Sequence, residues 1–325
     1  MKYTFIHAEL LMYPLSVVCY VLGVTQSGFH AWRGRGPSTR AQERTRLSAD
    51  IRRVFDDHRG RYGAPRIYRV LCGQHGYAGS VNRIQTLMRA MGLRALAGKK
   101  YKVTTDSGHA LPIAPNLLGQ DFSCDASAES TSHAKAPDQV WLSDITYLWT
   151  GEGWLYVCCV LDLFTRRIVG WSIEPHMTRE MVLAALDMAY VNRRSPRGLL
   201  FHSDRGSQYA SGDVRDWLCL RGMRQSMSGT GNCYDNAPME SFWHSMKVEE
   251  THGQNFPTRA EAKHCVFAYI EGWYNTTRMN SSLSYKSPAQ FEREHHAQLL
   301  KAANGELTAM PGNISQSARL QKRTA

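Results

Sequence analysis

The sequence lacks the cysteine patterns of a zinc finger and of a disulfide-stapled secreted domain. Its 325 residues include eight cysteines, none of which forms a C-x-x-C pair. Closely spaced pairs are typical of structural zinc sites, and dense cysteine frameworks are typical of small secreted domains. Cys158 and Cys159 are adjacent inside an apolar run, which favours buried strand residues. We therefore expect reduced thiols and a cytoplasmic protein.

A membrane-spanning run and internal repeats are also missing. The apolar stretch from Leu10 to Val24 is interrupted by Pro14 and Ser16, and it is shorter than the roughly 20 residues that cross a bilayer. No small-residue cleavage pattern follows it, so we expect a folded helical element rather than a signal peptide or a membrane partner. No repeat with a period of 20 to 50 residues is visible, which argues against a solenoid.

Acidic side chains are scarce in the first third of the chain. Residues 1–105 hold 18 basic and 5 acidic side chains, so the whole net charge of +11 originates there. Eleven arginines and no lysine lie between Arg33 and Arg69. Arginine suits bidentate contacts with phosphates and guanine edges, so this region favours DNA binding. The alternative is a solvated basic face whose arginines pair within their own helices.

Helical patterns fill this basic region. Residues 15–33 indicate two helices around a turn at Gly23, and further helices are predicted over 47–58, 64–72 and 80–92. The last has apolar residues at helical spacing, which leaves Arg83 and Arg89 on its other side. We predict that residues 1–102 form a basic, helix-turn-helix-like DNA-binding region, in which the candidate DNA contacts are Arg52, Arg53, Arg66, Arg83 and Arg89.

From residue 139 the sequence changes to strands rich in aromatic and β-branched side chains. Strands are predicted over 140–149, 154–164 and 167–174, followed by alternating helix and strand: helix 179–191, a short apolar run 199–201, helix 212–221, a short segment 223–226, and helices 236–250 and 259–274. This order predicts an α/β sheet domain over residues 138–295. Residues 103–137 are interpreted as a linker, and residues 296–325 as a loose tail.

Three carboxylates in this domain occupy positions that favour chemistry. Asp144 interrupts a strand, where an unpaired acid is costly, and Asp204 follows a strand end, where open α/β sheets tend to bind ligands. Glu240 shares a helix face with His244 and Lys247. Together the acids suit Mg²⁺ or Mn²⁺, and two such ions promote phosphodiester displacement.

Other side chains compete for these roles. Asp162 is either a further metal ligand or a turn-forming aspartate. His202 and His244 could assist phosphate chemistry, but a structural role is favoured. The aromatic residues that could stack on DNA bases are expected to be core residues; these are Tyr234, Trp243 and Trp273.

The residues around the acids resemble those of a known family. The segments that carry the resemblance are WLSDITYLWT, VLDLFTRRIVGW, FHSDRGSQYAS, GNCYDNAPMESFWHSMKVE and YIEGWYNTTRMNSSLSYKSPAQFE. They resemble the catalytic core of bacterial insertion-sequence transposases of the IS-three family, second-frame (OrfB) product, from about residue 140 to 291. In the front region, YGAPRIYRVL and SVNRIQTLMRAMGLRA resemble the helix-turn-helix-type segment of the same family.

The resemblance implies an RNase H-like, retroviral-integrase-type core with a mixed five-stranded sheet. It implies an Asp, Asp, Glu site formed by Asp144, Asp204 and Glu240, whose 35-residue spacing between the last two matches the family, and it places Lys247 near DNA. It further implies a Mg²⁺-dependent transposase with two ions per site, which cleaves and joins strands at element ends. The implied partners are double-stranded DNA, a first-frame OrfA protein or fusion, and further copies of the chain on DNA, in the bacterial cytoplasm at the nucleoid.

The sequence departs from the family pattern at two places, and two alternative functions remain. Residues 121–137 are longer than the usual link before the core, and Asn280 and Ser284 stand where many relatives have His and Gly. No histidine and cysteine zinc module occurs in residues 1–130, which argues against a retroviral integrase. The alternative functions are a plain metal-dependent endonuclease and a catalytically silent DNA-binding regulator of transposition.

Overall fold

The computed structural model describes residues 2–9, 12–96, 111–124, 133–194, 198–229, 233–251 and 253–309. The chain divides into two units, Met1–Ala95 and Leu96–Ala325. Residues 103–110 and 125–132 of the predicted linker, and residues 310–325 of the predicted tail, lie outside the described residues. None of the described helices is long and apolar enough to cross a membrane.

The first unit begins with three short helices, α1 (Lys2–Glu9), α2 (Leu15–Val21) and α3 (Gln26–Gly34). Helices α2 and α3 agree with the helix-turn-helix pattern in the sequence, and the turn between them contains Gly23 at a φ of +59°. The Thr25 side chain caps α3 by accepting a hydrogen bond from the Gly28 N–H at 3.0 Å. A small buried cluster joins the three helices: Ile6, Val18, Cys19 and Phe29.

Three longer helices follow in the same unit: α4 (Thr39–Asp57), α5 (Ala64–His75) and α6 (Val81–Ala90). Helix α4 starts eight residues before the predicted start, because Ser38 caps it and its first two turns are polar. Ser80 caps α6 as expected. These helices contact one another through buried residues that include Ile51, Ile67 and Ile84.

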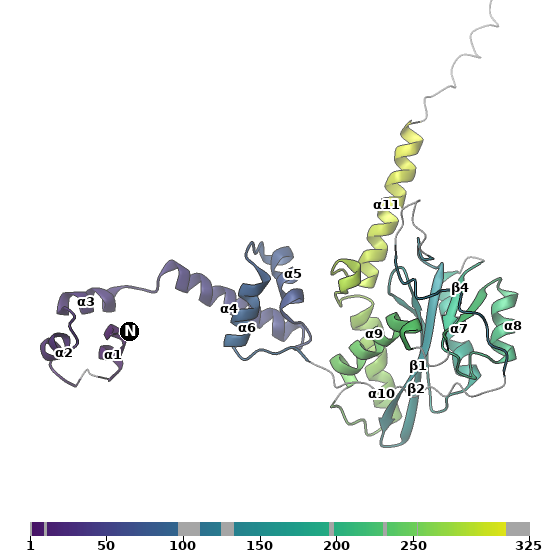
Figure 1. Cartoon of the computed structure of the whole chain (residues 1–325), viewed down its shortest axis with the longest axis horizontal. Coiled ribbons are helices and arrows are strands. Elements are labelled where there is room, and N and C mark those ends of the chain that lie inside the picture. The colour runs from purple at the N-terminus through teal and green to yellow at the C-terminus, as the bar shows by residue number, and fades with distance from the viewer. Residues whose placement is uncertain are drawn as a thin grey trace, which may run out of the picture. The chain divides into compact units, whose positions relative to one another are not determined.

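The second unit is built on a mixed five-stranded sheet (Figure 1). Its strands are β1 (Val140–Thr150), β2 (Gly153–Asp162), β3 (Ile168–Glu174), β4 (Leu200–Ser203) and β5 (Arg224–Met227), in the spatial order β3-β2-β1-β4-β5. Strands β1 to β3 form the predicted antiparallel meander, whereas β4 runs parallel to both β1 and β5. The sequence therefore predicted the three meander strands to within a few residues, and β4 and β5 coincide with the short apolar run 199–201 and the short segment 223–226.

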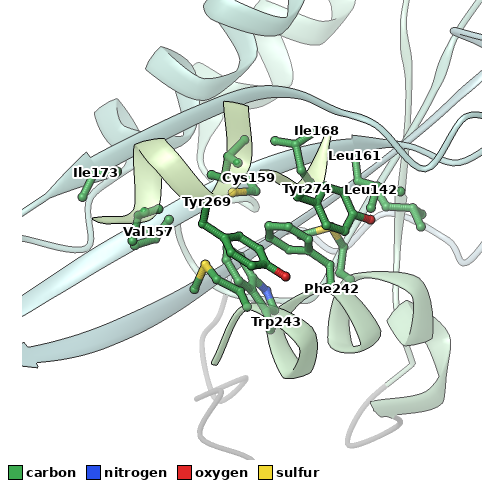
Figure 2. Close-up of a cluster of buried hydrophobic side chains, with 14 of the residues drawn as sticks. Leu142, Val157, Cys159, Leu161, Ile168, Ile173, Phe242, Trp243, Tyr269 and Tyr274 are labelled. Carbon is green, nitrogen blue, oxygen red and sulfur yellow. The ribbon is translucent and has the colours of Figure 1, made fainter. Parts of the chain in front are cut away.

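Helices cover both faces of the sheet because side chains along the central strands alternate between two buried clusters. Trp141 and Cys158 pack with α7 (Arg179–Arg193) and α8 (Gly212–Leu220). Leu142 and Cys159 pack on the other face with α9 (Ala237–Met246) and α10 (Arg259–Phe267). Figure 2 shows the second cluster, where aromatic rings from the helices lie over apolar strand residues.

The helices of the second cluster depart from the predicted regular form. Helix α9 continues into a π-helical segment, η2 (Lys247–Thr251), and α10 continues into another, η3 (Ala268–Tyr274). A short 3-10 turn, η1 (Cys233–Asn236), precedes α9, and another, η4 (Ser281–Leu283), follows η3. π-Helical turns are often found at functional sites.

The C-terminal region differs from the expected loose tail. Helix α11 runs from Pro288 to Ala309, past the predicted boundary at residue 296. From His296 to Asn304 its side chains are exposed, so helix-favouring residues and not burial maintain it there. The described part of the predicted linker also differs, since Leu118 is buried against the core and Phe122 packs beside it.

Strand β3 and helix α7 approach closely at Gly170. A Cβ atom at this position would lie 2.6 Å from the Ala189 backbone nitrogen and would also clash with the Ala185 carbonyl oxygen. We expect Gly170→Ala to lower the free energy of unfolding by about 1 to 3 kcal/mol or more, because backbone atoms cannot easily move aside. Urea denaturation followed by tryptophan fluorescence measures the loss.

Gly272→Ala is the matched control, because a Cβ atom there meets open space. We expect its stability to be unchanged or slightly higher, as for other helical glycines replaced by alanine. Equal stability of the two variants would contradict the close packing of β3 on α7.

Candidate active site

Neighbouring parallel strands bring Asp144 and Asp204 together. Leu142 on β1 is opposite His202 on β4. Parallel strands advance equally, so two residues further on Asp144 lies beside Asp204. Both carboxylates are partly exposed. The Ile145 N–H donates to Asp144 Oδ1 at 2.8 Å, and the Gly206 N–H donates to Asp204 Oδ1 at 2.9 Å, so backbone groups orient each acid.

Helix α9 carries Glu240 to the same edge of the sheet. Glu240 is exposed in the first turn of this helix. One turn later, the buried Trp243 donates its Nε1–H to Asp144 Oδ2 at 3.0 Å. Before the helix, Asn236 Nδ2 donates to the Ser143 carbonyl at 3.0 Å. Two hydrogen bonds therefore tie the start of α9 to β1 on either side of Glu240.

The charges of the three acids interact. Burial raises the pKa of Asp144 to about 8, and the neighbouring charges of Asp204 and Glu240 add to this effect. The N–H groups of Ile145 and Trp243 oppose it. Burial also raises the pKa of Glu240. None of the ion pairs formed by the described residues includes Asp144. Concentrated negative charge of this kind is what a bound cation neutralises.

The donor set suits a hard divalent cation held in part by other ligands. No group of three or more His, Cys, Asp or Glu side chains within the described part of the chain is close enough to enclose an ion by itself. Mg²⁺ is usually bound through one or two carboxylates, with water and phosphate oxygens completing its shell. The adjacent Asp144 and Asp204, with Glu240 nearby, fit that requirement because all three supply oxygen.

Trp243 has a role that the sequence did not reveal. It was expected to be a core residue, and it is buried, but it also fixes one oxygen of Asp144. If the chain carries out the DNA strand cleavage that the family resemblance implies, we expect Trp243→Phe to slow it by about 10- to 100-fold, since a hydrogen bond to a charged group contributes roughly 1.5 to 3 kcal/mol. Single-turnover cleavage rates measure this effect.

Trp217→Phe is the control for that substitution. Trp217 is also largely buried, and its Nε1–H donates to Asp187 at 2.8 Å, away from the three acids. We expect its cleavage rate to stay within about threefold of the unaltered protein, because the bond it loses lies outside the site. Similar losses in both variants would refute a specific role for Trp243.

The basic residues predicted to contact DNA fall in both units. Lys247 is the first residue of η2, and its Nζ lies 5.5 Å from the centre of the Tyr147 ring. The five candidate arginines belong to the first unit. Arg83 and Arg89 are exposed on α6, and Arg52 and Arg53 are exposed on α4.

Three of these arginines also have partners within the unit. Arg52 Nη2 donates to the Met91 carbonyl at 3.5 Å. Arg53 pairs with Asp50 at 2.9 Å, and Arg66 lies over the Tyr62 ring at 5.5 Å. Such pairing is the structural alternative considered for the arginine-rich region, and it applies to these three residues. The solvent-facing arginines of α6 are the more accessible to a phosphate backbone.

Asp162 and His202, which were considered as a further metal ligand and as a catalytic group, make structural contacts. Asp162 is fully buried and accepts hydrogen bonds from the Thr165 N–H at 2.7 Å and the Thr165 hydroxyl at 2.6 Å, which fits a turn-forming aspartate. His202 is buried between Ser226 and Ser228, and burial lowers its pKa to about 4. It is therefore neutral at physiological pH.

The aromatic and histidine candidates near α9 are divided between the core and the surface. Trp273 is partly buried and donates to Glu249 at 3.1 Å. Tyr234 and His244 are exposed. The core interpretation therefore holds for Trp243 and Trp273, whereas Tyr234 lies at the surface.

Asp235, just before α9, joins segments that are far apart in the sequence. This buried carboxylate accepts hydrogen bonds from Asn116 Nδ2 at 3.0 Å and Gln120 Nε2 at 2.7 Å, and from the Gly229 N–H at 2.6 Å. The segment assigned to the linker is thus fastened to the turn that leads into the Glu240 helix. Nothing in the local sequence pattern predicted this contact.

Comparison with protein families gives three matches along the chain. A model described as an integrase core domain matches residues 134–233, and a second integrase core domain model matches residues 240–295. An HTH-like domain model matches residues 42–101. The first match includes Asp144 and Asp204, and the second begins at Glu240.

Individual proteins show similarity over nearly the whole chain. Transposase InsF for insertion sequence IS3A of Escherichia coli is 42% identical over 299 residues, which cover 91% of this chain and 100% of InsF. A 31 kDa protein of insertion element IS600 from Shigella sonnei is 40% identical over 279 residues, covering 86% and 98%. The HTLV-2 integrase catalytic core domain in complex with magnesium is 15% identical, with a TM-score of 0.37, covering 48% of this chain and 97% of that domain.

Proposed function

The chain belongs to the IS3 family of insertion-sequence transposases, and on that premise we propose that Asp144, Asp204 and Glu240 form its catalytic centre. The family relation confirms the predicted DNA transposase function, the integrase-type core and the HTH-like front region. The observation that carries the proposal is that Asp144 on β1 lies beside Asp204, directly after the parallel strand β4, and that the helix with Glu240 is hydrogen-bonded to Asp144.

The proposed cofactor is Mg²⁺ or Mn²⁺, with two ions per site, held by these three carboxylates. When bound, the ions activate an attacking oxygen and stabilise the leaving oxygen of a phosphodiester. The protein contributes fixed orientation. The Ile145 N–H and the Trp243 indole hold one oxygen each of Asp144, and each oxygen keeps a lone pair for a ligand. Preorganised ligands reduce the cost of reaching the reactive geometry.

The proposed reaction has two steps at one site. Water first cleaves one strand at the element end and leaves a 3′ hydroxyl. That hydroxyl then attacks a second phosphodiester, so that one P–O bond forms while another breaks and its oxygen leaves with the displaced strand. The hydroxyl attacks directly, so no covalent protein intermediate is required.

DNA binding is divided between the two units in this proposal. The five arginines of the first unit contact the terminal repeats, and Lys247 contacts DNA beside the catalytic centre. We further propose that the protein acts as a homo-oligomer on DNA, together with or fused to a first-frame OrfA protein. We expect it in the bacterial cytoplasm, associated with the nucleoid.

An in vitro assay tests the proposed chemistry. The purified full chain is incubated with a labelled duplex of the element end, with Mg²⁺, Mn²⁺ or excess chelator. We expect a nick bearing a 3′ hydroxyl, followed by joined product, in Mg²⁺ and Mn²⁺, and no product with chelator. Nicks that never yield joined product would instead support the endonuclease alternative. End binding without any nick would support the silent regulator.

A further inference from the structure

Four aromatic side chains gather at the end of the β1–β2 hairpin. We call them the hairpin aromatic cluster: Tyr147, Trp149, Trp154 and Tyr156. Tyr147 is opposite Tyr156 and Trp149 is opposite Trp154, so all four lie on the same face of the sheet. Trp149 is 59% exposed and Trp154 is 45% exposed. Two neighbouring tryptophans with this much exposed surface mark a site that receives a partner.

The rings form one surface by packing edge to face. The ring centres of Trp149 and Trp154 are 4.8 Å apart with an angle of 76° between the rings. Tyr147 and Trp154 are 5.0 Å apart at 87°. Because adjacent rings are nearly perpendicular, one presents its face while the next supports it from the side. A flat group can therefore stack on Trp149 while Trp154 limits its position.

The hairpin end is held rigidly. The Gly151 N–H donates to the Phe256 carbonyl at 2.8 Å, and the Arg259 N–H donates to Glu152 Oε2 at 2.8 Å. A Cβ atom at Gly151 would lie 2.5 Å from the Pro257 carbonyl oxygen, so the two segments are in close contact. These contacts fix the direction in which Trp149 and Trp154 project, which lowers the entropic cost of binding.

The cluster shares strand β1 with Asp144 and lies beside positive charge. Tyr147 and Trp149 follow Asp144 by three and five residues on the same strand, or about 10 and 17 Å at the rise of a β-strand, and by alternation they project from the opposite face of the sheet. Strand β4 pairs with β1 only over Val140–Leu142, so beyond Asp144 a DNA strand can pass around this edge of β1. Lys247 lies against the Tyr147 ring, and Arg259 Nε donates to the Trp154 carbonyl at 3.3 Å. At the 3.4 Å per nucleotide of paired DNA, about 17 Å corresponds to about five nucleotides, and an extended unpaired strand needs fewer.

We propose that Trp149, supported by Trp154, stacks on an unpaired base of the DNA strand beside the catalytic centre. The proposal rests on the proposed function, because it is the carboxylate site that brings DNA to this hairpin. Flanking cations favour a nucleic acid over a second protein chain. Stacking is tolerant of sequence, since every base has a flat face, and this suits an enzyme that binds both an element end and a varied target.

Binding measurements test the proposal without requiring catalysis. Each variant is prepared in the Glu240→Gln background, and its affinity is measured by fluorescence anisotropy without added metal. Two labelled DNAs are used, an element end and an unrelated duplex that represents the target. Each is prepared fully paired and with five unpaired nucleotides, which in the element end lie next to the cleavage position. We expect Trp149→Ala to weaken binding of the unpaired forms by about 5- to 100-fold and of the paired forms by less than about twofold.

The two DNAs identify which source supplies the base. A loss confined to the unpaired element end assigns the stacked base to the element, and a loss confined to the unrelated duplex assigns it to the target. We expect Trp149→Phe to retain affinity within about threefold of the parent, because a flat ring remains. Leu220→Ala removes another exposed apolar side chain of the same unit and is expected to change nothing.

Several outcomes would overturn the stacking proposal. The first is unchanged DNA affinity in Trp149→Ala, and the second is an equal loss of affinity with paired and unpaired DNA. The third is a change of oligomeric state, measured by sedimentation, with DNA binding intact. That third outcome would make the cluster a protein interface. If the melting temperature of Trp149→Ala shifts beyond that of Leu220→Ala, the same comparison is made with Trp154→Ala, and the same outcomes decide. Because affinity is measured without turnover, this test can still be interpreted if the catalytic proposal fails.

Discussion

Replacing Asp144 or Asp204 by asparagine, or Glu240 by glutamine, is expected to reduce strand cleavage and joining by on the order of 10³-fold or more. Each amide keeps the size of the side chain but removes the negative charge that would hold a divalent cation. Groups that act as one unit show losses of this size when any member is removed. Single-turnover rates on labelled element ends measure the effect.

The same variants should keep their fold and their affinity for DNA. The negative charges of Asp204 and Glu240 act on the carboxylate of Asp144, so neutralising one acid leaves the melting temperature unchanged or raises it. Removing negative charge near a phosphate also maintains or tightens binding. Asp216→Asn, an exposed aspartate on α8, is the control and should cleave normally. Cleavage that survives in Asp144→Asn would contradict the assigned site.

Arg278→Met is expected to lower the free energy of unfolding by about 3 to 5 kcal/mol, the largest stability effect we expect in this chain. Arg278 and Glu249 form a buried ion pair, with side chains only 7% and 6% exposed. Arg278 Nε lies 2.8 and 2.9 Å from the two oxygens of Glu249. Tyr269 and Trp273 also donate to this carboxylate, each at 3.1 Å. Losing the arginine leaves a buried charge without its cation.

The position of this ion pair gives the substitution a functional consequence. Glu249 belongs to η2 and its aromatic donors belong to η3, so these hydrogen bonds join the two π-helical segments, and the ion pair ties η2 to the residues after η3. Lys247 lies two residues before Glu249. Arg278→Met should therefore also displace Lys247 and weaken DNA binding at the core.

Urea unfolding measures the Arg278→Met effect against a surface pair. Arg179 pairs with Asp213 at 2.7 Å, but both side chains are more than half exposed, so Arg179→Met should cost less than about 1 kcal/mol. Combining Arg278→Met with Glu249→Gln should recover part of the loss, because the isolated charge is then removed as well. Equal costs for the two arginine variants would refute the buried pair.

The sequence predicted the sheet well because its strands have strong local signals. The aromatic and β-branched runs that became β1 and β2 are bounded by turn residues, and their alternating side chains require two covered faces. Asp144 and Asp204 could be singled out because an acid in or after a buried strand is unusual. Their partnership with Glu240 came from a family resemblance, since 28 acidic residues offer many possible triples.

Long-range side-chain contacts could not be predicted from the sequence. The hydrogen bond from Trp243 to Asp144 joins residues 99 positions apart, and Asp235 gathers donors from residues 116 and 120. The buried pair between Glu249 and Arg278 joins residues 29 positions apart, which no local propensity encodes. Helix α11 was missed because its outer half has helix-favouring composition without a buried stripe.

The most direct test of the central claim is detection of joined element ends in cells. The full chain, with any upstream reading frame, is expressed beside a plasmid-borne copy of its element, and the DNA across abutted ends is amplified. We expect junctions with the unaltered chain and none with Glu240→Gln. Junctions that persist in Glu240→Gln, or that are missing with an unaltered chain that still binds end DNA, would contradict the claim.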